Sequence, residues 1–433
     1  MRRRHLAKKR RLLTRLRHAH RIAARAAVFG PRSRVIQMIA GDRRSPVASR
    51  TGDQLKVSIP ETFSLVDDAE GAIRLIQDVA AALRSRPDLR NLHIDHSGMK
   101  RYDLAANALL DVVIIEFQQQ LRMNGLRLRA RGAYPEDAGL RRFIDAIGIV
   151  AHLKVPRRLT KAEEEKKLKI FDRRVRYYER PTSPKLTEPR EQVAAGFVRH
   201  IDACLAGRKL QLTTVGVAKL STCLVEMINN AEEHAQMTDW SLLGYLDSSL
   251  EIPICEIAIF NFGRTMAETF QALDKDDYAW KQQQVGEYVE LHSAQKLFSQ
   301  GWREEDLLTV IALQPNISSK NSSSDASRGL GTVDLLNFFN RMHEACTGCE
   351  EGAKMTLISG STNICFDGTY GLKAAEGRRV IAFNEANDLR QRPDSKHVRS
   401  LGELRFPGTA ISIKFPLVQS MVGEIPNGTH SGN

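Results

Sequence analysis

The segment from residue 220 to 235 constrains the fold most, because it predicts one long amphipathic helix with reactive groups on its polar side. Its apolar residues recur at helical spacing and are Leu220, Leu224, Val225 and Ile228. Glu226 and Asn230 are four residues apart and therefore share one helix face. A carboxylate there can orient or deprotonate an attacking hydroxyl, and an amide oxygen one turn later can ligate Mg²⁺. Taken alone, the segment fits better a packed helix whose polar face is hydrated.

Two downstream segments predict strands that carry polar groups at their ends. Residues 257–264, IAIFNFGR, form a β-branched and aromatic run that ends in Asn261 and Gly263. An asparagine there can hydrogen-bond the edge of a base, and a glycine lets the backbone approach a ligand closely. Residues 408–416, GTAISIKFP, alternate as a strand does and begin with a hydroxyl beside a glycine. The second segment is equally typical of a plain hairpin strand.

A glycine-rich segment lies between these two strands. Residues 327–332, SRGLGT, follow the polar run 318–326 and precede an apolar helical pattern that begins at Val333. A flexible polar loop that leads into a helix N-terminus offers free backbone N–H groups and the positive end of the helix dipole to an anion. The segment therefore predicts a phosphate-binding loop.

The four segments together resemble the N, G1, G2 and terminal G-T boxes of the GHKL family of Bergerat-fold ATPases, over about residues 190–418. The resemblance implies a two-layer α/β sandwich that binds ATP and Mg²⁺. It implies that Glu226 acts as general base or orienting carboxylate and that Asn230 ligates Mg²⁺. His234 stands where several kinases of the family have a histidine or a basic residue.

The resemblance also implies a set of nucleotide-binding residues, of which Lys320 and Arg328 are candidates for neutralising the γ-phosphate. The set is Asn261, Gly263, Lys320, Arg328, Gly329, Leu330, Gly331, Thr332 and Thr409. The chain departs from the family where Asn261 replaces the adenine-binding aspartate, Thr265 replaces a glycine, and Ser327 replaces another. An asparagine oxygen can still accept from an adenine amino group, but it lacks the charge that strengthens such a bond by about a factor of two. The preference for ATP over GTP therefore stays open.

Residues 53–153 alternate between strand and helix patterns. Strands are expected at 55–59, 92–95 and 126–130, and helices at 67–83, 104–121 and 137–147. The order predicts a small α/β unit with a mostly parallel sheet. It resembles a STAS domain of anti-sigma-factor antagonists, whose phosphorylated serine would follow Asp103. Leu104 and Ala105 occupy those positions, so the resemblance implies a docking module and not a phosphorylation switch.

The net positive charge lies wholly in the first 41 residues. Thirteen of the 64 Lys and Arg residues precede the first acidic residue, Asp42, which leaves 51 basic and 51 acidic residues in the rest. The basic arm, residues 1–41, can contact nucleic acid or an anionic membrane surface, or it can serve as a solvated arm that aids solubility. A charged, proline-containing linker is expected at 154–189 and a flexible tail at 419–433.

Composition excludes several other classes of protein. With 433 residues, of which 42% are hydrophobic, the chain is long enough for two or three domains. We find no apolar run of the 18 or so residues that a membrane helix needs and no signal-peptide pattern, so a cytoplasmic protein is expected. The six cysteines show no secreted disulfide framework, and the pair Cys346 and Cys349 lacks the second close pair that a structural zinc site needs.

The sequence therefore predicts a bacterial regulatory protein that binds ATP, hydrolyses it with Mg²⁺ and controls a protein partner. One alternative is a serine/threonine protein kinase of the anti-sigma-factor type, in which Glu226 acts on a protein hydroxyl. Another is a nucleotide-gated scaffold or nucleic-acid-binding module without catalysis. Residues 267–302 are expected to form a helical lid. Members of the family often form homodimers, but no long heptad run supports one here.

Overall fold

The computed structural model describes residues 33–43, 54–147, 168–175, 190–234, 240–281, 283–321, 331–346, 352–375, 378–418 and 420–425. The chain separates into two compact units, one within residues 1–156 and one that runs from residue 157 onward, with the short stretches 64–70 and 102–106 grouped with the second. Helices alternate or pack with sheets in both, which confirms the predicted α/β class.

The first unit is built on a three-stranded parallel sheet in the order β1-β3-β5. Its strands and helices follow the predicted order: β1 (Gln54–Ser58), α3 (Ala69–Ser85), β3 (Asn91–Asp95), α4 (Leu104–Met123), β5 (Arg129–Ala133) and α5 (Ala138–Ala146). A short helix and a two-residue ribbon complete it: α2 (Arg34–Ala40), β2 (Thr62–Phe63) and β4 (Arg101–Tyr102). Helix α5 begins where the Asp137 carboxylate accepts from the backbone N–H of Leu140, at 2.7 Å.

One strand of this unit begins later than predicted. The sequence pattern places it at 126–130, whereas β5 starts at Arg129, opposite Asn91. The Leu126 N–H still bonds the carbonyl of Leu121, at 2.9 Å, and Gly125 has a φ of +70°. These residues therefore complete the C-terminal cap of α4 before the strand can begin.

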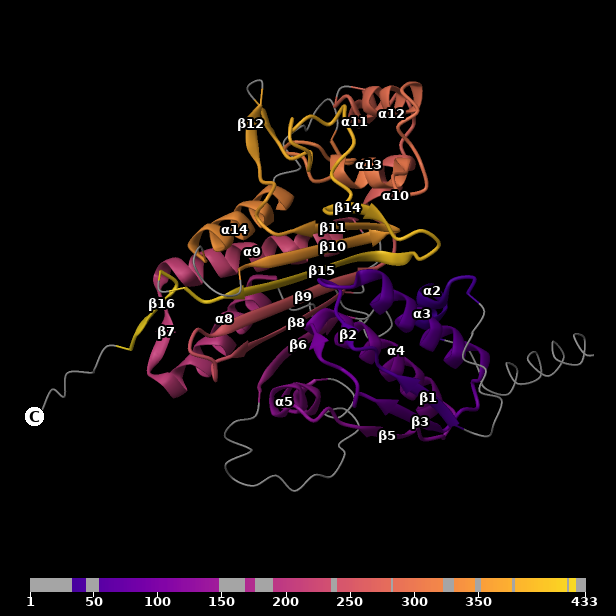
Figure 1. Ribbon diagram of the computed structural model, residues 1–433, viewed down its shortest axis with the longest axis vertical. Helices are drawn as coiled ribbons and strands as arrows, with labels where there is room; N and C mark the ends of the chain where they lie inside the picture. The colour runs from indigo at the N-terminus through magenta and orange to yellow at the C-terminus, as the bar shows by residue number, and fades with distance from the viewer. Residues whose placement is uncertain are drawn as a thin grey trace, which may run out of the picture. The chain divides into compact units, whose positions relative to one another are not determined.

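The second unit is built on a seven-stranded antiparallel sheet (Figure 1). In order across the sheet, its strands are β14 (Val398–Ser400), β11 (Thr362–Phe366), β10 (Lys354–Gly360), β15 (Phe406–Pro416), β9 (Ile254–Phe262), β8 (Trp240–Asp247) and β6 (Ile170–Val175). Strands β9 and β15 correspond to the two predicted polar-ended strands, and they are direct neighbours with Asn261 opposite Thr409.

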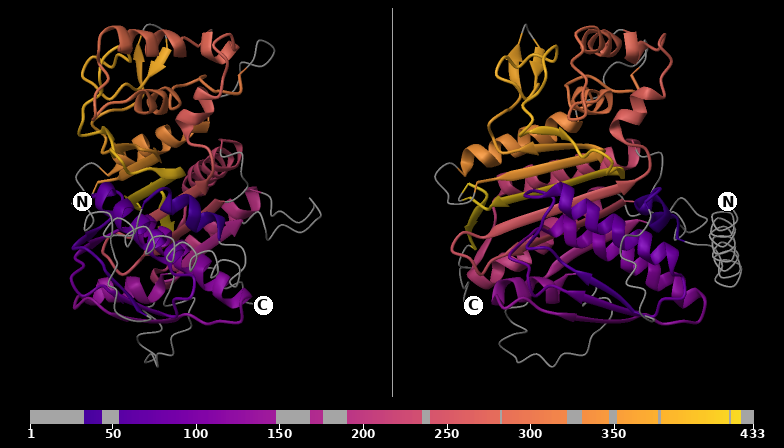
Figure 2. Two further views of the ribbon diagram at one scale, coloured as in Figure 1. Left: turned by 90° about the vertical axis from the view of Figure 1, so that its right-hand side faces the viewer. Right: turned by 45° about the vertical axis from the view of Figure 1, so that its right-hand side comes forward.

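Three helices pack against one face of this sheet (Figures 1 and 2). They are α8 (Arg190–Leu205), α9 (Thr214–His234) and α14 (Gly331–Ala345). Helix α9 lies between the other two and contacts both of them and the strands beneath. The apolar face predicted for it is confirmed, since Leu220, Leu224 and Ile228 are fully buried in the common core. Helix α9 and the start of α14 are thus brought to the same side of β9 and β15.

Two segments expected outside the folded region belong to it. Ile170–Val175 lies within the expected linker but forms the edge strand β6, where Phe171 packs edge-to-face on Phe197 of α8 at 5.3 Å. Val422–Glu424 lies within the expected tail but forms β16, which pairs with β7 (Leu210–Leu212). Both segments are short. Phe171 is the buried apolar residue among the described side chains of β6, and β16 has none but follows the buried Met421, so neither shows an apolar period in the sequence.

The insertion between β9 and α14, which was expected to be helical, contains four short helices in its described residues. They are α10 (Met266–Gln271), α11 (Tyr278–Lys281), α12 (Val285–Ala294) and α13 (Glu304–Ile311), and they extend beyond the end of the sheet together with the hairpin of β12 (Lys373–Ala375) and β13 (Arg378–Val380) (Figure 2). The buried His292 ring joins these parts, because its Nδ1 accepts from the Trp302 indole at 3.1 Å and its Nε2 donates to the Leu389 carbonyl at 2.9 Å. Burial lowers the pKa of His292, in keeping with a neutral ring.

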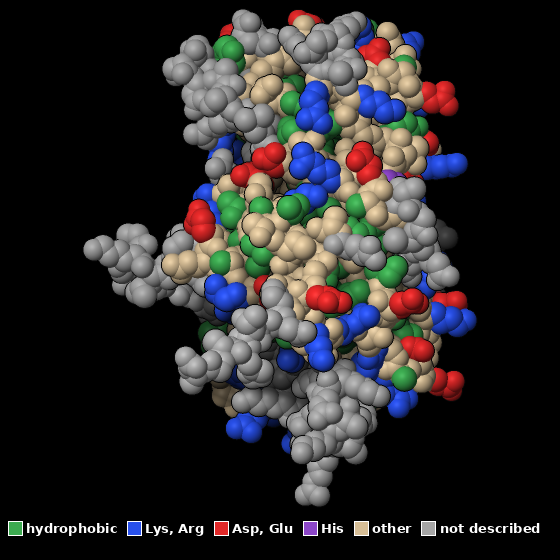
Figure 3. Space-filling model, turned by 90° about the vertical axis from the view of Figure 1, so that its left-hand side faces the viewer, with side chains coloured by type: hydrophobic (Ala, Val, Ile, Leu, Met, Phe, Trp, Pro, Cys, Tyr) green, Lys and Arg blue, Asp and Glu red, His purple; other side chains and the backbone are tan. Residues whose placement is uncertain are grey.

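One face of the molecule carries charges of both signs. Acidic and basic side chains are interspersed on the face shown in Figure 3. This agrees with the equal numbers of acidic and basic residues that the sequence gives for the chain after the arm. In the described stretches, no helix is both long enough and apolar enough to span a membrane.

Candidate functional site

A pocket opens in the second unit between α9, α14 and the strands β9, β10 and β15. It spans about 450 Å³ of atom-free space, which includes open solvent. Its apolar lining is Met227, Ala231, Ile259, Phe260, Met266, Leu335, Leu357 and Ile411, and its polar lining is Asn230, Asn261, Thr332 and Thr409. An apolar pocket with a few convergent polar groups is the usual form of a ligand site.

The four polar residues come from four separate segments, and all four were predicted from the sequence. Asn230 comes from α9, Asn261 from β9, Thr332 from α14 and Thr409 from β15. The structure thus brings together one residue from each of the four segments that the sequence analysis selected. Among the described residues that line the pocket, none carries a charge.

Helix α9 presents Asn230 to the pocket at a half-buried position. Met227, Asn230 and Ala231 lie three and four residues apart, so they form one strip of the helix surface. Within the described stretches, no hydrogen-bond partner satisfies the Asn230 carboxamide, which leaves it available to a ligand or to water. Glu226 lies one turn earlier, is half-buried and accepts a long hydrogen bond of 3.5 Å from the Asn229 amide. It is not among the lining residues.

The C-terminal part of α9 is held by an ion pair that the sequence analysis did not anticipate. The Arg190 guanidinium at the start of α8 contacts the Glu232 carboxylate at 2.7 Å and also donates to the Asn229 side-chain oxygen. Glu232 in turn accepts from the Trp240 indole at 3.0 Å. These contacts fix the turn of α9 that carries Asn230. His234 is the last residue of α9, and its side chain lies outside the described part of the chain.

Asn261 joins α9 to β15 through its side chain. Its Nδ2 donates to the carbonyl of Ala231 at 2.8 Å, and its Oδ1 accepts from the backbone N–H of Thr409 at 2.8 Å. The residue is only 3% exposed, so losing either bond would leave a buried backbone group unpaired. A carboxylate could accept from Thr409 but could not donate to Ala231. This is a physical reason for an amide at a position where the family has an aspartate.

Two glycines allow β9 and β15 to approach at this point. Gly263 has a φ of +140° and donates its N–H to the Pro407 carbonyl at 3.1 Å. Gly408 has a φ of +135°, and a Cβ on it would lie 2.2 Å from the Asn261 carbonyl oxygen. Gly263 was predicted as a site residue, but it does not line the pocket, and its backbone N–H contacts β15 instead.

A chain of hydroxyl groups continues from Thr409 toward the helical insertion. Its Oγ1 lies 3.0 Å from the Oγ of Ser359, which also accepts from the Met266 backbone N–H at 2.9 Å. Ser359 is completely buried and was not predicted. Thr265 was noted as a departure from the family, and the structure gives its role: its hydroxyl accepts from the Glu268 N–H at 3.2 Å and so caps helix α10.

The predicted phosphate-binding residues are placed only in part. Gly331 is the first residue of α14, and Thr332 lines the pocket while 9% exposed, so the N-terminus of a 15-residue helix meets the pocket. Arg328, Gly329 and Leu330 lie outside the described residues. Lys320 is exposed, and its backbone N–H bonds the Ser318 hydroxyl at 3.3 Å. It does not line the pocket.

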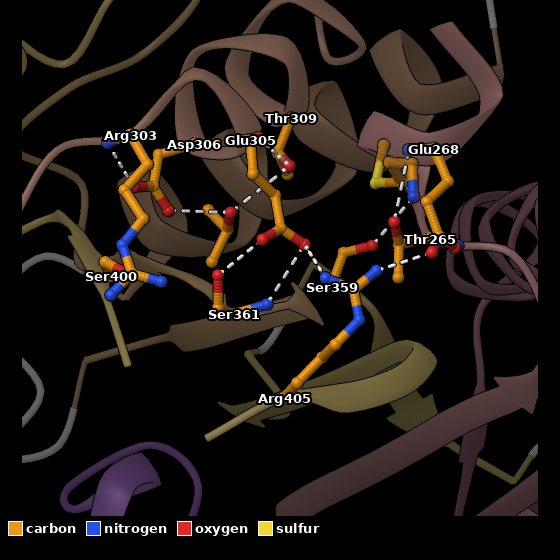
Figure 4. Close-up of polar contacts among 12 residues, drawn as sticks. Thr265, Glu268, Arg303, Glu305, Asp306, Thr309, Ser359, Ser361, Ser400 and Arg405 are labelled. Carbon is orange, nitrogen blue, oxygen red and sulfur yellow. Dashed lines mark hydrogen bonds and ion pairs between the residues drawn. The ribbon is translucent and has the colours of Figure 1, made fainter. Parts of the chain in front are cut away.

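A charged cluster lies beside the hydroxyl chain, at the β10–β11 turn (Figure 4). The Arg405 guanidinium contacts Glu268 of α10 at 2.6 Å and Glu305 of α13 at 2.7 Å. Glu305 also accepts from the Ser361 hydroxyl at 2.6 Å. The neighbouring Asp306 is fully buried, and burial raises its pKa to about 6. The cluster therefore ties the insertion to the end of the sheet.

Some of the pocket-lining residues that were not predicted can be inferred from their spacing in the sequence. Ile259 and Ile411 lie two residues from Asn261 and Thr409 on their strands, and Leu335 lies three residues from Thr332 on its helix. Strand and helix periods would have placed these residues beside the predicted ones. Met266, Leu357 and Ser359 carry no such signal, because only the tertiary fold brings their segments to the pocket.

Other candidate sites gain no support. Within the described stretches, no three His, Cys, Asp or Glu side chains gather in a way that could hold a metal ion. The Cys346 thiol points to the Pro416 carbonyl at 3.9 Å, and Cys349 lies outside the described residues. No family model, curated protein or solved structure matches the chain. Function is therefore judged from the chemistry of the pocket.

Proposed function

We propose that the second unit is a nucleotide-binding module of GHKL type that takes ATP with Mg²⁺ and that the protein regulates a partner through it. The observation that carries the proposal is the convergence of Asn230, Asn261, Thr332 and Thr409 on one apolar pocket. These residues come from four segments that are spread over residues 220–416 of the sequence. An apolar slot with hydrogen-bonding groups suits a purine ring, and a helix N-terminus beside it suits phosphates.

The donor set of α9 fits a hard cation. Mg²⁺ prefers oxygen ligands and keeps several waters, so one or two protein oxygens are enough. The Asn230 amide lines the pocket without a partner among the described residues, and the Glu226 carboxylate lies one turn away on the same helix face. In the proposal Asn230 holds the cation, which would supply charge compensation for the phosphates. Glu226 positions the water that attacks the γ-phosphate.

One observation favours a second candidate, a nucleotide-gated binding module without turnover. Among the described lining residues there is no carboxylate, and Glu226 lies outside the lining. A base that orients water must come within hydrogen-bonding reach of it, either directly or through one further water. In this alternative, ATP closes the helical insertion over the pocket, and the closed form binds the partner.

The first unit is proposed as a docking module of STAS type. Its support is the parallel sheet β1-β3-β5 and the start of α4, where the Asp103 carboxylate accepts from the Ala106 N–H at 2.7 Å. Leu104 and Ala105 follow this cap and carry no hydroxyl. Phosphorylation at that site has no acceptor, so regulation would act through binding.

Equilibrium ATP binding and single-turnover γ-phosphate release test the proposal. Both are measured with and without Mg²⁺ on the wild type, Asn230→Ala and Glu226→Ala, with Glu290→Ala as a control for an exposed carboxylate on α12. Hydrolysis predicts Mg²⁺-dependent binding that is lost in Asn230→Ala, and release that is lost in Glu226→Ala but not in Glu290→Ala. Tight binding with no release by the wild type would select the nucleotide-gated module. Absence of binding at millimolar ATP would refute both candidates.

A further inference from the structure

The three-stranded sheet of the first unit has one face that is open to solvent. Helices α3 and α4 lie along the other face (Figures 1 and 2). Exposure alternates along β1, where Leu55 and Val57 are buried while residues 54, 56 and 58 are exposed. Strand β3 alternates in the same way, with Leu92 and Ile94 buried. Parallel sheets are usually covered on both faces, so an open face on this sheet requires an explanation.

The open face carries two rows of polar side chains that run across the three strands. In register, one row is Lys56, His93 and Arg131, and the other is Gln54, Asn91 and Arg129. The Lys56 side chain is 60% exposed, and Arg129 and Arg131 are exposed as well. Within the described stretches, the side chains of the two arginines have no hydrogen-bond or ion-pair partner. Their guanidinium groups are therefore available to an anion.

The open face has a positive net charge. The one carboxylate among its described strand residues is that of Asp95, which lies 3.7 Å from the Lys56 ammonium and accepts from the Ser97 hydroxyl at 2.6 Å. Arg129 and Arg131 stand two residues apart on β5, so their Cα atoms are about 6–7 Å apart along the strand. That spacing is comparable with the distance between successive phosphates of an extended nucleic-acid strand. The face can thus meet a row of phosphates and not only a single anion.

The kinds of side chain on the open face distinguish between classes of anionic partner. Interfaces between proteins have an apolar centre with few charges, and binding to a membrane surface buries apolar side chains. The largest apolar side chain among the described strand residues of this face is that of Ala133. Interfaces with nucleic acids are strongly positive, and their phosphate contacts come from Arg, Lys, Ser, Asn and Gln. These residue types make up most of the open face.

We propose that the open face of the β1-β3-β5 sheet binds a single nucleic-acid strand through its phosphates, with Lys56, Arg129 and Arg131 as the charged contacts. Gln54 and Asn91 add hydrogen bonds to phosphate or sugar oxygens. A flat sheet face does not enter the groove of a duplex, whereas a single strand can lie along it. Among the described residues of this face there is no Phe, Tyr or Trp on which bases could stack, so binding does not depend on base sequence. The site requires neither ATP nor the pocket of the second unit.

Salt-dependent binding of RNA to the full chain tests the proposal. The affinity for a labelled, mixed-sequence single-stranded RNA is measured by fluorescence anisotropy, without ATP, from about 50 to 200 mM NaCl. In the face variant, Lys56→Gln with Arg129→Gln and Arg131→Gln, the affinity should fall by roughly 10- to 100-fold. The slope of log K against log salt should become shallower by about 2, because each phosphate contact to a single strand contributes about 0.7. The basic arm is the same in all proteins and contributes equally to each.

A matched control removes three exposed basic side chains from the second unit, by Lys275→Gln with Lys354→Gln and Arg399→Gln. It makes the same change in net charge, but it should lower the affinity by less than about threefold and leave the salt slope unchanged. The single variant Gln54→Lys adds a charge to the open face. It should tighten binding by about three- to fivefold and steepen the slope by about 0.7.

Several outcomes would overturn the proposal. Equal losses in the two triple variants, or no loss in the face variant, would show that the open face makes no phosphate contacts of its own. Should the face variant fail to fold, Gln54→Lys decides alone, and an unchanged affinity overturns the proposal. Polyglutamate, or vesicles of phosphatidylcholine and phosphatidylserine, could bind more tightly than RNA and lose that binding in the face variant. The partner would then be an acidic protein or a membrane surface instead.

Discussion

The second unit contains two neighbouring polar clusters, one held by neutral hydrogen bonds and the other by ion pairs. The pocket cluster, Asn261, Thr409 and Ser359, is neutral, with Asn261 and Ser359 buried and Thr409 half-buried, and its partners are mostly backbone groups. The charged cluster, Glu268, Glu305 and Arg405, consists of ion pairs, and the Arg405 side chain is 44% exposed. Breaking a buried neutral hydrogen bond lowers the stability of the fold substantially, whereas breaking an exposed ion pair lowers it little. The comparison shows that the β9–β15 side of the pocket is joined by neutral hydrogen bonds, whereas ion pairs join the insertion to the sheet.

The largest effect is expected at Gly408, which sets the approach of β15 to β9. In Gly408→Ala, the new Cβ would lie 2.2 Å from the Asn261 carbonyl oxygen at a φ of +135°. Backbone strain and overpacking together should lower the free energy of unfolding by about 4 kcal/mol. All three tryptophans, at 240, 280 and 302, lie in the second unit, so urea unfolding followed by their fluorescence reports on that unit.

The variant Gly402→Ala separates the cost of backbone strain from the cost of steric overlap by the added Cβ. Gly402 also has a positive φ, +65°, but no atom lies within 4 Å of its Cβ position. Its replacement should cost about 1 kcal/mol, the usual penalty of the left-handed region. Equal losses in the two variants would show that the β9–β15 junction is not tight and would weaken the contrast between the clusters.

Removal of the Asn261 amide should have the next largest effect. Asn261→Ala leaves the Ala231 carbonyl and the Thr409 N–H without their partners, and each buried unpaired group costs roughly 1–3 kcal/mol. We expect a loss of about 3 kcal/mol in the same unfolding experiment. Asn230→Ala removes an amide from the same pocket that has no described partner, and it should change stability by less than about 0.5 kcal/mol. A loss below about 1 kcal/mol in Asn261→Ala would contradict a structural role for the pocket cluster.

The buried carboxyl group beside the charged cluster should give that region a pH dependence of its own. Asp306 accepts from the Arg303 N–H at 2.7 Å and from the Thr362 hydroxyl at 2.8 Å, yet burial raises its pKa from 3.8 to about 6. Between these values the folded chain keeps a proton that the unfolded chain has lost. The stabilisation is therefore fully present below about pH 4 and falls as pH rises through about 6, by roughly 2–3 kcal/mol.

Asp306→Asn should remove this contribution. The free energy of unfolding is measured from pH 4 to pH 7 in both proteins, and the difference between the two curves isolates Asp306, since the other titrating groups are shared. The wild-type curve should fall more steeply with rising pH than that of the variant. Parallel curves would mean that Asp306 is ionised in the folded protein throughout this range.

The pocket cluster and the charged cluster also differ in how much of each could be predicted from the sequence. Helix α9 and the strands β9 and β15 follow from apolar periodicity, and Asn230, Asn261 and Thr409 follow from the polar groups set into those patterns. Each of these signals lies within one segment of the sequence. The sequence therefore indicates the individual residues, whereas the fold brings them together in one pocket. Edge strands such as β6 and β16 are too short to show a period.

The charged cluster could not be predicted for a different reason. Arg405 and Glu268 are 137 residues apart, and no local pattern relates them. The sequence does not indicate the role of Ser359 either, because a serine in a strand is typical of many solvent-facing positions. Ser359 meets Thr409 because β10 and β15 lie side by side, and Arg405 meets Glu268 because α10 packs near the start of β15, so both contacts depend on the tertiary fold and not on any one segment.

The smallest effect is expected from the ion pairs of Arg405, although ion pairs this short look strong. Arg405→Ala removes contacts to both Glu268 and Glu305, but solvent screens a guanidinium that is 44% exposed. The free energy of unfolding should fall by about 1 kcal/mol or less, and raising NaCl from about 0.05 to 1 M should lower the stability of the wild type toward that of the variant. Glu305→Gln keeps the Ser361 contact while removing one charge, and it should cost less still. A salt-independent loss above about 2 kcal/mol in Arg405→Ala would show that the charged cluster is as strongly coupled as the pocket cluster. In that case the ion pairs would have to be regarded as part of the same rigid framework that shapes the pocket, and the contrast between the two clusters would fail.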